Sequence, residues 1–452
     1  MDHAPTTPPV TADHAVSTDA AVQAQLDRLW SLSPGADVLG LDRITRLLAR
    51  LGDPHRALPP VFHVAGTNGK GSTCAFLRGA LEAAGHRVHV YSSPHLVRFN
   101  ERIRLAGRLI DDAALAALLS EVLDHADGIG ASFFEITTAA AFLAFARTPG
   151  DACVIEVGLG GRLDATNVLP APVACGIAAL GIDHQAFLGD TLEQIAAEKA
   201  GIAKPGVPLV TMAYPSAIAA KVAHVATARG ASFFSQGEAW HYAAVDDRLH
   251  YDDRNGSLDL PSPSMPGAHQ GANLALAAAM IRHQSTLSVP AGTLAASSVT
   301  TRWPARLQRL SPGPLIAPLS DVPVWLDGGH NASAGRAVAA ALPHHLGDPC
   351  TRSLTVIVGM LANKDAAGFL APFANAVGTL IAVPVPGHAC HAPADLLRVA
   401  AELGVPHRLS AVNVPAALAT IAVVHPRPAG VLIAGSLYLA GEVLRANDEV
   451  PD

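Results

Sequence analysis

Short runs of apolar residues alternate with amphipathic segments along most of this chain. Apolar residues spaced three and four apart predict two helices near the N-terminus, at residues 21–29 and 41–51, joined by the turn Ser33-Pro34-Gly35. Such an alternation predicts an α/β fold with a parallel sheet that helices cover on both faces. The strand-like runs of this sheet are residues 61–65, 87–91, 152–157, 173–179 and 208–212.

The pattern then changes and begins again, which predicts two domains. Residues 235–266 are polar, turn-rich and strand-prone, as in a small β excursion, and an alanine-rich helix follows at 271–282. A second, smaller α/β domain is predicted from strand-like runs at residues 324–327, 354–359, 379–383 and 430–434. The predicted division is a disordered tail at 1–20, a first domain at 21–297, a linker at 298–303 and a second domain at 304–447.

Composition narrows the classes of partner and compartment. Half of the 452 residues are hydrophobic, 15% are charged and the net charge is −7, so nucleic acid and anionic membrane surfaces are poor partners. The five cysteines form no CxxC pair, which argues against a disulfide framework or a zinc ribbon. The N-terminus lacks the basic and apolar stretches of a signal peptide, and the apolar run at 430–440 is too short to span a bilayer. We expect a cytoplasmic protein and a monomer.

The string VFHVAGTNGKGST, at residues 61–73, joins a strand to glycines and a lysine. The turn allows main-chain N–H groups to converge on an anion, and the lysine adds a cation. A helix opening at Ser72 and ending before Gly85 would direct its positive end at the same anion. The predicted nucleotide contacts are Gly66, Thr67, Asn68, Gly69, Lys70, Gly71 and Ser72.

The spacing departs from the usual P-loop. Only Thr67 and Asn68 separate the two glycines, and Gly71 follows Lys70 where that motif has Ser or Thr. A plain turn between strand and helix would explain a lone lysine equally well. The string AGTNGKGST instead resembles the ATP loop of the Mur-ligase superfamily, in the form carried by folylpolyglutamate synthases and dihydrofolate synthases. Further strings agree with this family from about residue 32 to residue 442.

A second group of residues follows the strand at 152–157, in EVGLGGRLDATN. A carboxylate that leaves a buried strand, here Glu156, is costly to bury unpaired, and a magnesium ion with its preference for oxygen ligands would remove that cost. A glycine-rich turn explains the glycines but not Glu156. The string resembles the family motif at every position, which implies that Glu156 is a metal ligand and that Asp164 contacts a pteridine.

Two further loops resemble the same family. SSPHLVRFNERI, at residues 92–103, follows the second strand, and the resemblance implies that Ser93 helps to hold magnesium; a loop with a surface charge pair is the plainer interpretation. SFFE, at residues 132–135, precedes a helix, and its aromatic residues could simply pack in the core. The resemblance places Phe134 against the pterin.

The segment DHQAFLGDTLEQIAAEKAGI, at residues 183–202, contains a predicted helix start, because Thr191 and Gln194 form a capping box. A lone histidine or lysine here would ordinarily be structural or solvated. The resemblance implies that His184 binds a second magnesium ion and that Lys199 is carbamylated. In HQGAN, at residues 269–273, the resemblance places Asn273 near adenine.

The second domain carries the remaining similarities. WPARL, at 303–307, resembles a family segment whose arginine, here Arg306, reaches the transferring phosphate across the interdomain cleft. In LDGGHN, Asp327 is a candidate ribose or phosphate partner and His330 a candidate ligand of the incoming amino acid, while Ala332 stands where the family usually has proline. GMLANKD and GSLYLAGE complete the match. His388 and His391 could form a metal pair or be ordinary loop histidines.

The resemblance implies a P-loop ATPase domain followed by a Rossmann-like domain, and one type of reaction. ATP, with two magnesium ions, phosphorylates a substrate carboxylate, and the amino group of L-glutamate attacks the acyl phosphate. The implied substrates are dihydropteroate and reduced folates. The expected catalytic residues are Lys70, Lys199, Arg306 and His330.

Two alternatives remain at this point. A ligase that adds amino acids to a UDP-sugar peptide shares the ATP machinery, but SPHLVRFNERI and EVGLGGRLDATN belong to the folate branch. A nucleotide-binding module without catalysis would need only the loop at Gly66. It gives no reason for Glu156, His184 and Lys199.

Overall fold

The computed structural model describes residues 16–32, 38–345, 353–423 and 427–452, and these form two compact units, essentially Ser17–Pro304 and Ala305–Pro451. The expected tail at residues 1–15 and the expected turn at 33–35 lie outside the described residues. Residues 16–20, the end of that expected tail, are described, and helix α1 (Ala20–Leu32) begins there.

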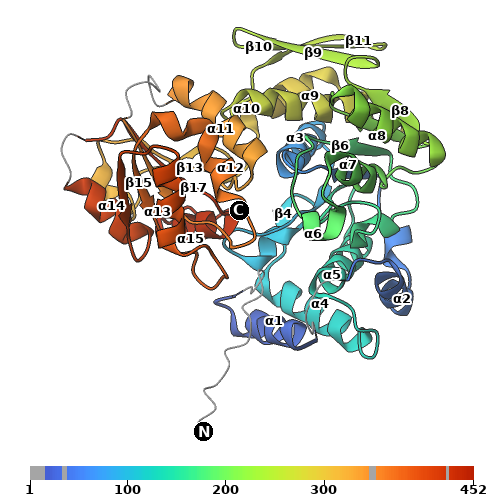
Figure 1. Ribbon diagram of the computed structural model, residues 1–452. Helices are drawn as coiled ribbons and strands as arrows, with labels where there is room; N and C mark the ends of the chain where they lie inside the picture. Colours follow the sequence, from blue (N-terminus) through green and yellow to red (C-terminus); the bar gives the residue numbers. More distant parts are fainter. Residues whose placement is uncertain (1–15, 33–37, 346–352, 424–426) are drawn as a thin grey trace. The chain divides into compact units, whose positions relative to one another are not determined.

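The first unit is built on a sheet that has eight strands within the described residues (Figure 1). Six neighbouring strands are parallel, and a short antiparallel pair, which the sequence pattern had not predicted, extends one edge. The strand order is β4 (Arg108–Leu109), β3 (Ile103–Leu105), β2 (Val88–Tyr91), β5 (Ala152–Glu156), β1 (Val61–Ala65), β6 (Ala174–Ile177), β7 (Pro208–Thr211) and β8 (Ser232–Ser235).

Helices cover both faces of this sheet. Alternate residues of β1 point to opposite faces, so Phe62 and Val64 pack with helices α3 and α9, whereas Ala65 packs with α7 and α8. The helices that follow α1 are α2 (Asp42–Arg50), α3 (Lys70–Ala83), α4 (Asp112–His125), α5 (Phe133–Arg147), α6 (Gln185–Leu188), α7 (Leu192–Ala200), α8 (Ser216–Ala228), α9 (Ala268–Arg282) and α10 (Ala291–Thr300).

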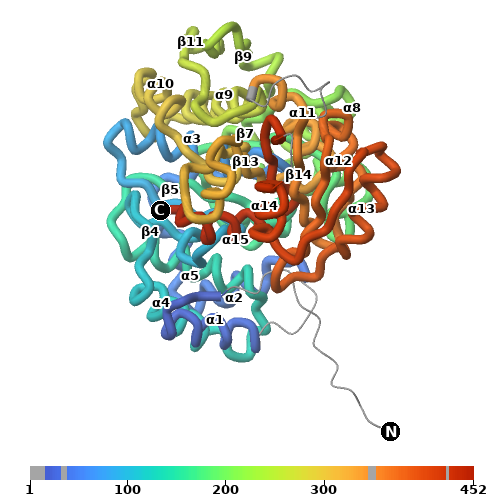
Figure 2. Tube along the Cα trace, turned by 90° about the vertical axis from the view of Figure 1, so that its left-hand side faces the viewer, coloured from blue at the N-terminus to red at the C-terminus, as the bar shows by residue number. Residues whose placement is uncertain are grey.

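The predicted β excursion is a small antiparallel sheet in the order β11 (Gly256–Pro261), β10 (Arg248–Asp253), β9 (Trp240–Val245). Its buried residues Trp240, Leu249 and Tyr251 join the core that α3 and α9 form on the main sheet. Two views place this small sheet at one end of the first unit, with α1, α2 and α4 at the other end (Figures 1 and 2). Helix α10 runs through Thr300, so the first half of the expected linker is helical.

The second unit is a smaller α/β domain around one sheet. The strand order within the described residues is β12 (Gln308–Arg309), β13 (Val324–Leu326), β17 (Gly430–Ala434), β14 (Leu354–Val358), β15 (Val377–Ala382) and β16 (His407–Ser410). Within the described residues, β12 is the one antiparallel strand of this sheet, and β16 is an edge strand that the sequence pattern had not predicted. The helices are α11 (Ala332–His345), α12 (Ala366–Leu370), α13 (Pro393–Glu402), α14 (Val414–Ala422) and α15 (Leu437–Ala446).

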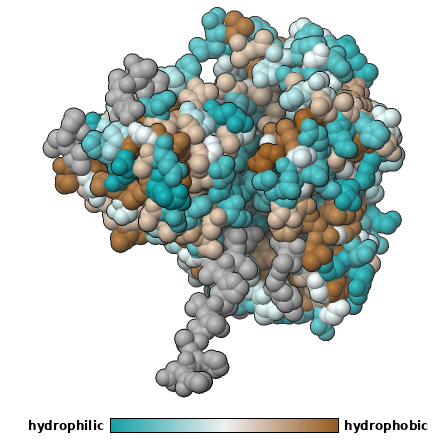
Figure 3. Space-filling model, in the orientation of Figure 1, coloured by the Kyte–Doolittle hydropathy of each residue, from teal (hydrophilic) through white to brown (hydrophobic). Residues whose placement is uncertain are grey.

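These two units confirm the predicted fold class, a parallel-sheet domain followed by a second α/β domain. Hydrophilic and hydrophobic residues are mixed over the visible face of the molecule (Figure 3). Among the described residues, every helix is too short or too polar to cross a lipid bilayer. The cysteines that the structure describes, Cys74, Cys153, Cys175 and Cys390, are all free thiols.

Candidate active site

The glycine loop connects β1 to α3. Gly69 has a left-handed backbone (φ 84°) and caps α3, so the helix begins at Lys70 and not at Ser72 as predicted. A side chain at Gly69 would also place its Cβ 2.3 Å from Asn273 Oδ1, so glycine is required there. The first main-chain N–H that bonds back into the helix is that of Thr73, which donates to Gly69 O (2.9 Å). The N–H groups of the preceding turn therefore face out of the helix end, where an anion can bind.

Fewer main-chain N–H groups of this loop are available to an anion than the sequence suggested. The N–H groups of Thr67 and Asn68 donate to Ala179 O (2.8 and 3.1 Å), and the Thr67 hydroxyl donates to Gly181 O (3.0 Å). These two residues therefore anchor the loop to the end of β6 with their main-chain donors. The donors available at the helix end lie from Gly69 to Ser72.

Two residues that come late in the sequence of the first unit, Asn273 and Trp303, pack against this loop. The side chain of Asn273, on α9, lies against Gly69 and donates to Gln270 Oε1 (3.0 Å); it is 3% exposed. The indole of Trp303 lies against Gly71. The glycine loop between β1 and α3, which we call the nucleotide loop after its predicted role, is thus packed between α9 and Trp303.

Two of the predicted metal ligands lie together at the same edge of the sheet. Glu156 ends β5 and is 5% exposed, and the N–H of Ser93, which follows β2, donates to Glu156 Oε2 (3.4 Å). The carboxyl ends of parallel strands are where open α/β sheets bind ligands. Carboxylate and hydroxyl oxygens are hard donors, so Glu156 and Ser93 are residue types that fit magnesium.

Lys199 reaches the nucleotide loop from the last turn of α7. Its Nζ donates to Gly66 O (2.9 Å) and its side chain is 4% exposed. Burial, followed by the nearby charge of Lys70, lowers the pKa of Lys199 to about 7. The glycine-rich loop after β5 fixes this helix end, because the N–H of Arg162 donates to Glu198 O (2.8 Å). Its guanidinium also pairs with the Glu198 carboxylate (2.9 Å).

His184 is placed differently from the other predicted metal ligands. It is exposed and has a positive φ of 53° directly before the short helix α6, which the sequence pattern had not predicted. Among the described residues, no three His, Cys, Asp or Glu side chains converge on one metal position. A magnesium ion bound at Glu156 would therefore take its remaining ligands from Ser93, water and phosphate, which is how this ion is commonly held.

The predicted pteridine contacts, Phe134 and Asp164, each contact the glycine-rich loop that follows β5. A Cβ at Gly158 would lie 2.2 Å from Cζ of Phe134, so this glycine allows the partly exposed ring to lie on the loop. The Phe134 ring is 5.9 Å from that of Tyr91. Asp164, 2% exposed, accepts hydrogen bonds from Leu159 N (2.8 Å), Thr166 N (3.0 Å) and the Thr166 hydroxyl (2.5 Å). Burial raises the pKa of the Asp164 carboxyl group.

In the second unit, Asp327 at the end of β13 holds the turn that carries Arg306. Arg306 lies between two residues with positive φ, Ala305 (54°) and Leu307 (45°). The N–H of Leu307 donates to Asp327 Oδ2 (2.8 Å), and Gly328 N donates to Ala305 O (2.9 Å). Strained backbone of this kind persists only where its surroundings hold it, so the contacts of Asp327 and Gly328 fix the position of Arg306.

His330 follows in the same loop. Its Nδ1 donates to Gly328 O (3.0 Å), so the other ring nitrogen points away from this carbonyl group. Asn331 Oδ1 accepts from Ala334 N (2.9 Å) and so caps α11, with Ala332 as the first helical residue. Proline is favoured at that position, but the cap maintains the helix start without it.

The chain is similar to proteins of one known family. The family model described as "Dihydrofolate synthetase, C-terminal domain" matches residues 317–446. The dihydrofolate synthase/folylpolyglutamate synthase of Escherichia coli (strain K12) is 36% identical over 350 residues, which cover 77% of this chain and 78% of that protein. The chain belongs to the dihydrofolate synthase/folylpolyglutamate synthase family.

Solved structures of this family share the whole architecture. The E. coli FolC complex with DHPP and ADP has a TM-score of 0.84 and 31% identity, and the match covers 98% of this chain and 99% of that one. A bifunctional folylpolyglutamate synthase/dihydrofolate synthase with Mn, AMPPNP and L-glutamate bound has a TM-score of 0.81 and 31% identity, over 95% of this chain and 99% of that one.

The structure shows separate contacts for His388 and His391. The His391 ring bonds to Lys364 O (2.8 Å), whereas His388 stacks on Tyr438 with ring centroids 4.0 Å apart. Both lie in the loop that follows β15, and each has its own contact, as the interpretation as ordinary loop histidines expects.

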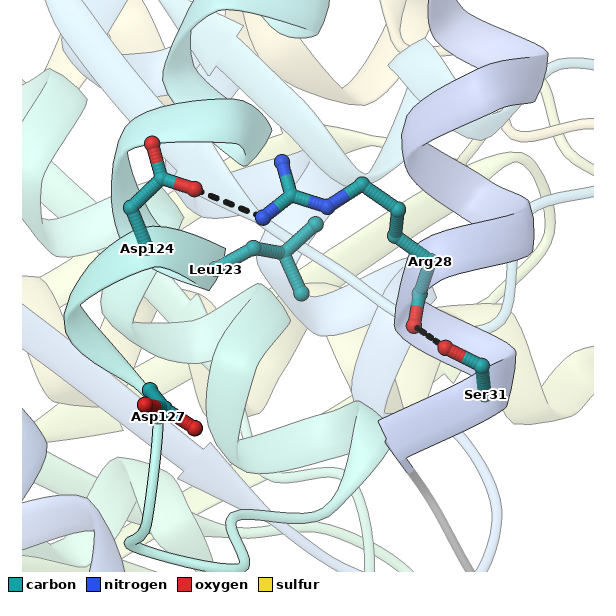
Figure 4. Close-up of a pocket in the computed structure, with 5 residues that line it drawn as sticks. All are labelled: Arg28, Ser31, Leu123, Asp124 and Asp127. Carbon is teal, nitrogen blue, oxygen red and sulfur yellow. Dashed lines mark hydrogen bonds and ion pairs between the residues drawn. The ribbon is translucent and has the colours of Figure 1, made fainter.

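A surface hollow of about 370 Å³ lies away from the predicted site residues, between α1 and α4 of the first unit (Figure 4). Its prominent contact is an ion pair between Arg28 and Asp124 (2.6 Å). None of the family's motifs contributes to it. Its lining residues are Arg28, Ser31, Leu123, Asp124 and Asp127.

Sequence reasoning missed one buried polar residue near the site. His63, in the middle of β1, is fully buried and contacts Thr166 Oγ1 (2.8 Å). Its position in the sequence could have indicated this contact, because burying a histidine in an apolar strand costs free energy unless the ring is hydrogen-bonded.

Proposed function

We propose that this chain is an ATP-dependent ligase that joins L-glutamate to a folate-type carboxylate through an acyl phosphate. The observation that carries the proposal is the grouping at one sheet edge of the first unit. Lys199 bonds to the nucleotide loop at Gly66, and Glu156 and Ser93 lie together at the ends of two other strands of the sheet. Membership of the family supports the same reaction.

The nucleotide and the metal are assigned from the residues that would hold them. Relatives were solved with ADP, and with AMPPNP and Mn, so ATP with a divalent cation, Mg²⁺, is proposed for this chain. Glu156 and Ser93 supply hard oxygen donors, and a magnesium ion there would neutralise phosphate charge. We also propose that His184 binds a second ion and that Lys199 is carbamylated.

The chain's own residues have distinct roles in this scheme. Lys70 and the N–H groups from Gly69 to Ser72 hold the phosphates and stabilise the charge that develops during transfer. Arg306 supplies a second cation for the transferring phosphate. His330 holds the incoming glutamate, and Asp327 fixes the turn that carries Arg306.

The folate side of the proposal has its own supporting contacts. Phe134 offers an aromatic face, and Asp164 offers a carboxylate acceptor for an N–H of a pterin ring. Asn273, packed against Gly69, is proposed to lie on the nucleotide side. Because the pterin-side elements accompany the complete set of glutamate-ligase residues, we propose both dihydrofolate synthase and folylpolyglutamate synthase activities. We further propose that the protein is a cytoplasmic monomer. Gel filtration tests the monomeric state by measuring its size.

Release of ADP tests the function directly. The purified chain is incubated with ATP, Mg²⁺ and L-glutamate, together with dihydropteroate, tetrahydrofolate or a UDP-sugar peptide acceptor in separate reactions. We expect ADP release with the first two acceptors and none with the third. Release with tetrahydrofolate alone would limit the function to polyglutamylation, and release with the UDP-sugar acceptor alone would overturn the folate assignment.

A further inference from the structure

His63, Thr166 and Asp164 form a chain of buried hydrogen bonds beneath the proposed folate contacts. His63 and Thr166 are fully buried, although 103 residues separate them in the sequence. His63 Nε2 lies 2.8 Å from Thr166 Oγ1, which lies 2.5 Å from Asp164 Oδ1. Thr166 belongs to the 3₁₀ turn Ala165–Val168, which Asp164 caps.

The direction of these hydrogen bonds follows from the number of hydrogens. Burial raises the pKa of Asp164, whereas the hydrogen bonds from Leu159 N and Thr166 and the charge of Lys70 favour its ionised form. In that form the carboxylate only accepts, so the single hydrogen of the Thr166 hydroxyl goes to Asp164. The contact between His63 and Thr166 must then use a hydrogen on Nε2, which fixes the tautomer of the imidazole. His63 Nδ1 is buried and has no hydrogen-bond partner within the described residues. Burial lowers the pKa of His63 to about 3, so the ring is neutral.

The same count shows what Asp164 can bind. A carboxylate has about four acceptor positions. Within the described residues, Oδ1 accepts from Thr166 N and Thr166 Oγ1, and Oδ2 accepts only from Leu159 N. One position on Oδ2 is left, and because it only accepts, it favours a ligand that presents a hydrogen-bond donor, such as a ring N–H.

We propose that His63 is a positioning residue for the folate site. Its Nε2–H donates to the Thr166 hydroxyl, which in turn donates to Oδ1 of Asp164. These two bonds hold the carboxylate so that Oδ2 is oriented toward an N–H donor of the pterin ring. This inference rests on the proposed function. It adds a buried strand residue that touches no substrate. An apolar residue would fill the same space in β1 but would leave the Thr166 hydroxyl without its donor.

Matched substitutions test the role of the donor. His63→Gln retains an N–H at the place of Nε2, whereas His63→Leu has a similar size and no donor. We expect His63→Leu to raise the KM for dihydropteroate and tetrahydrofolate about fivefold to tenfold, the effect of one net hydrogen bond. The KM for ATP and glutamate should stay unchanged, and His63→Gln should recover most of the loss.

A double-mutant cycle tests the route of the effect. If His63 acts through the Thr166 hydroxyl, the KM effects of His63→Leu and Thr166→Val should not add. Additive effects, an equal rise of KM for all substrates, or no recovery with His63→Gln would each overturn the proposal. Because a core substitution can also weaken folding, thermal unfolding of each variant is measured beside the kinetics.

Two further measurements separate this inference from the proposed function. If Asp164→Asn leaves the folate KM unchanged, the folate contact itself is wrong; if Asp164→Asn raises it and His63→Leu does not, only the positioning role fails. Nitrogen-15 NMR of the imidazoles, with the His63 signal assigned by its loss in His63→Gln, should show hydrogen on Nε2. Hydrogen on Nδ1 would overturn the proposal whatever reaction the enzyme catalyses.

Discussion

The side-chain nitrogen of Lys199 donates a hydrogen bond of 2.9 Å to the carbonyl oxygen of Gly66, 133 residues earlier in the chain. The lysine is 4% exposed, and burial, with a smaller contribution from Lys70, lowers its pKa to about 7. An ordinary lysine has a pKa of about 10.4 and is a cation at neutral pH. Lys199 is therefore neutral in a large fraction of molecules at pH 7, and this fraction rises with pH.

We expect this neutral amine to react with carbon dioxide. The amine nitrogen attacks the carbon and releases a proton, which leaves an anionic carbamate, an oxygen ligand that magnesium prefers. Wild-type activity should fall in buffer depleted of carbon dioxide and return with bicarbonate. Carbon-13 NMR with labelled carbon dioxide should show a carbamate signal that Lys199→Arg lacks. Indifference to bicarbonate together with full activity of Lys199→Arg would show that a simple cation suffices.

Lys70 is the first residue of α3, where its charge adds to the positive end of the helix. We expect Lys70→Ala to lower kcat by about 10²- to 10³-fold, since one lost donor to a developing charge costs about 3–4 kcal/mol. Lys221→Ala, on the exposed face of α8, is the control and should retain its turnover. Near wild-type turnover of Lys70→Ala would show that the loop does not bind the phosphates as proposed.

His330 is held by its bond to Gly328 O, with its second nitrogen directed away from this carbonyl group. We expect His330→Ala to raise the KM for glutamate about tenfold or more and to change the KM for ATP little, because a hydrogen bond to a charged group contributes about 1.5–3 kcal/mol. Steady-state kinetics with each substrate varied separately measures this. His407→Ala, exposed on β16, is the control. Equal effects on both KM values would indicate a general disturbance of the domain.

Acid stability should depend on Asp253 in the small sheet. Burial alone would raise the pKa of Asp253, but hydrogen bonds from Arg282, Asn255 N and Tyr251 outweigh it and hold this pKa below its ordinary value. Because the pKa is lower in the folded state, the stabilisation is complete above the unfolded pKa of about 3.9 and is lost as the pH falls through the folded value.

The variant Asp253→Asn removes this charge. We expect its free energy of unfolding at pH 7 to fall by about 2 kcal/mol, because the partly buried Arg282 loses a charged acceptor. Its stability should also decrease less than that of the wild type between pH 5 and pH 3. Urea unfolding at several pH values measures both effects, with the exposed Asp247→Asn as the control. Parallel pH curves for wild type and Asp253→Asn would contradict the prediction.

The sequence by itself determined the parts whose signals are local. The strand at Val61–Ala65 and the strand at Gly430–Ala434 were predicted at their observed bounds, because buried parallel strands are short apolar runs between turn residues. The capping box of Thr191 and Gln194 was predicted from spacing alone, since its hydrogen bonds join residues three apart. The fold class followed from the alternation of these elements.

Only the tertiary structure decided which distant groups share a hydrogen bond. That Ala179 O takes the N–H groups of Thr67 and Asn68, and that Lys199 reaches Gly66, could not be predicted from spacing, because strands far apart in sequence become neighbours in the sheet. The tautomer of His63 depends on Thr166, 103 residues away. Local patterns specify elements through backbone geometry and burial, whereas the pairing of buried polar groups depends on where packing brings those elements together.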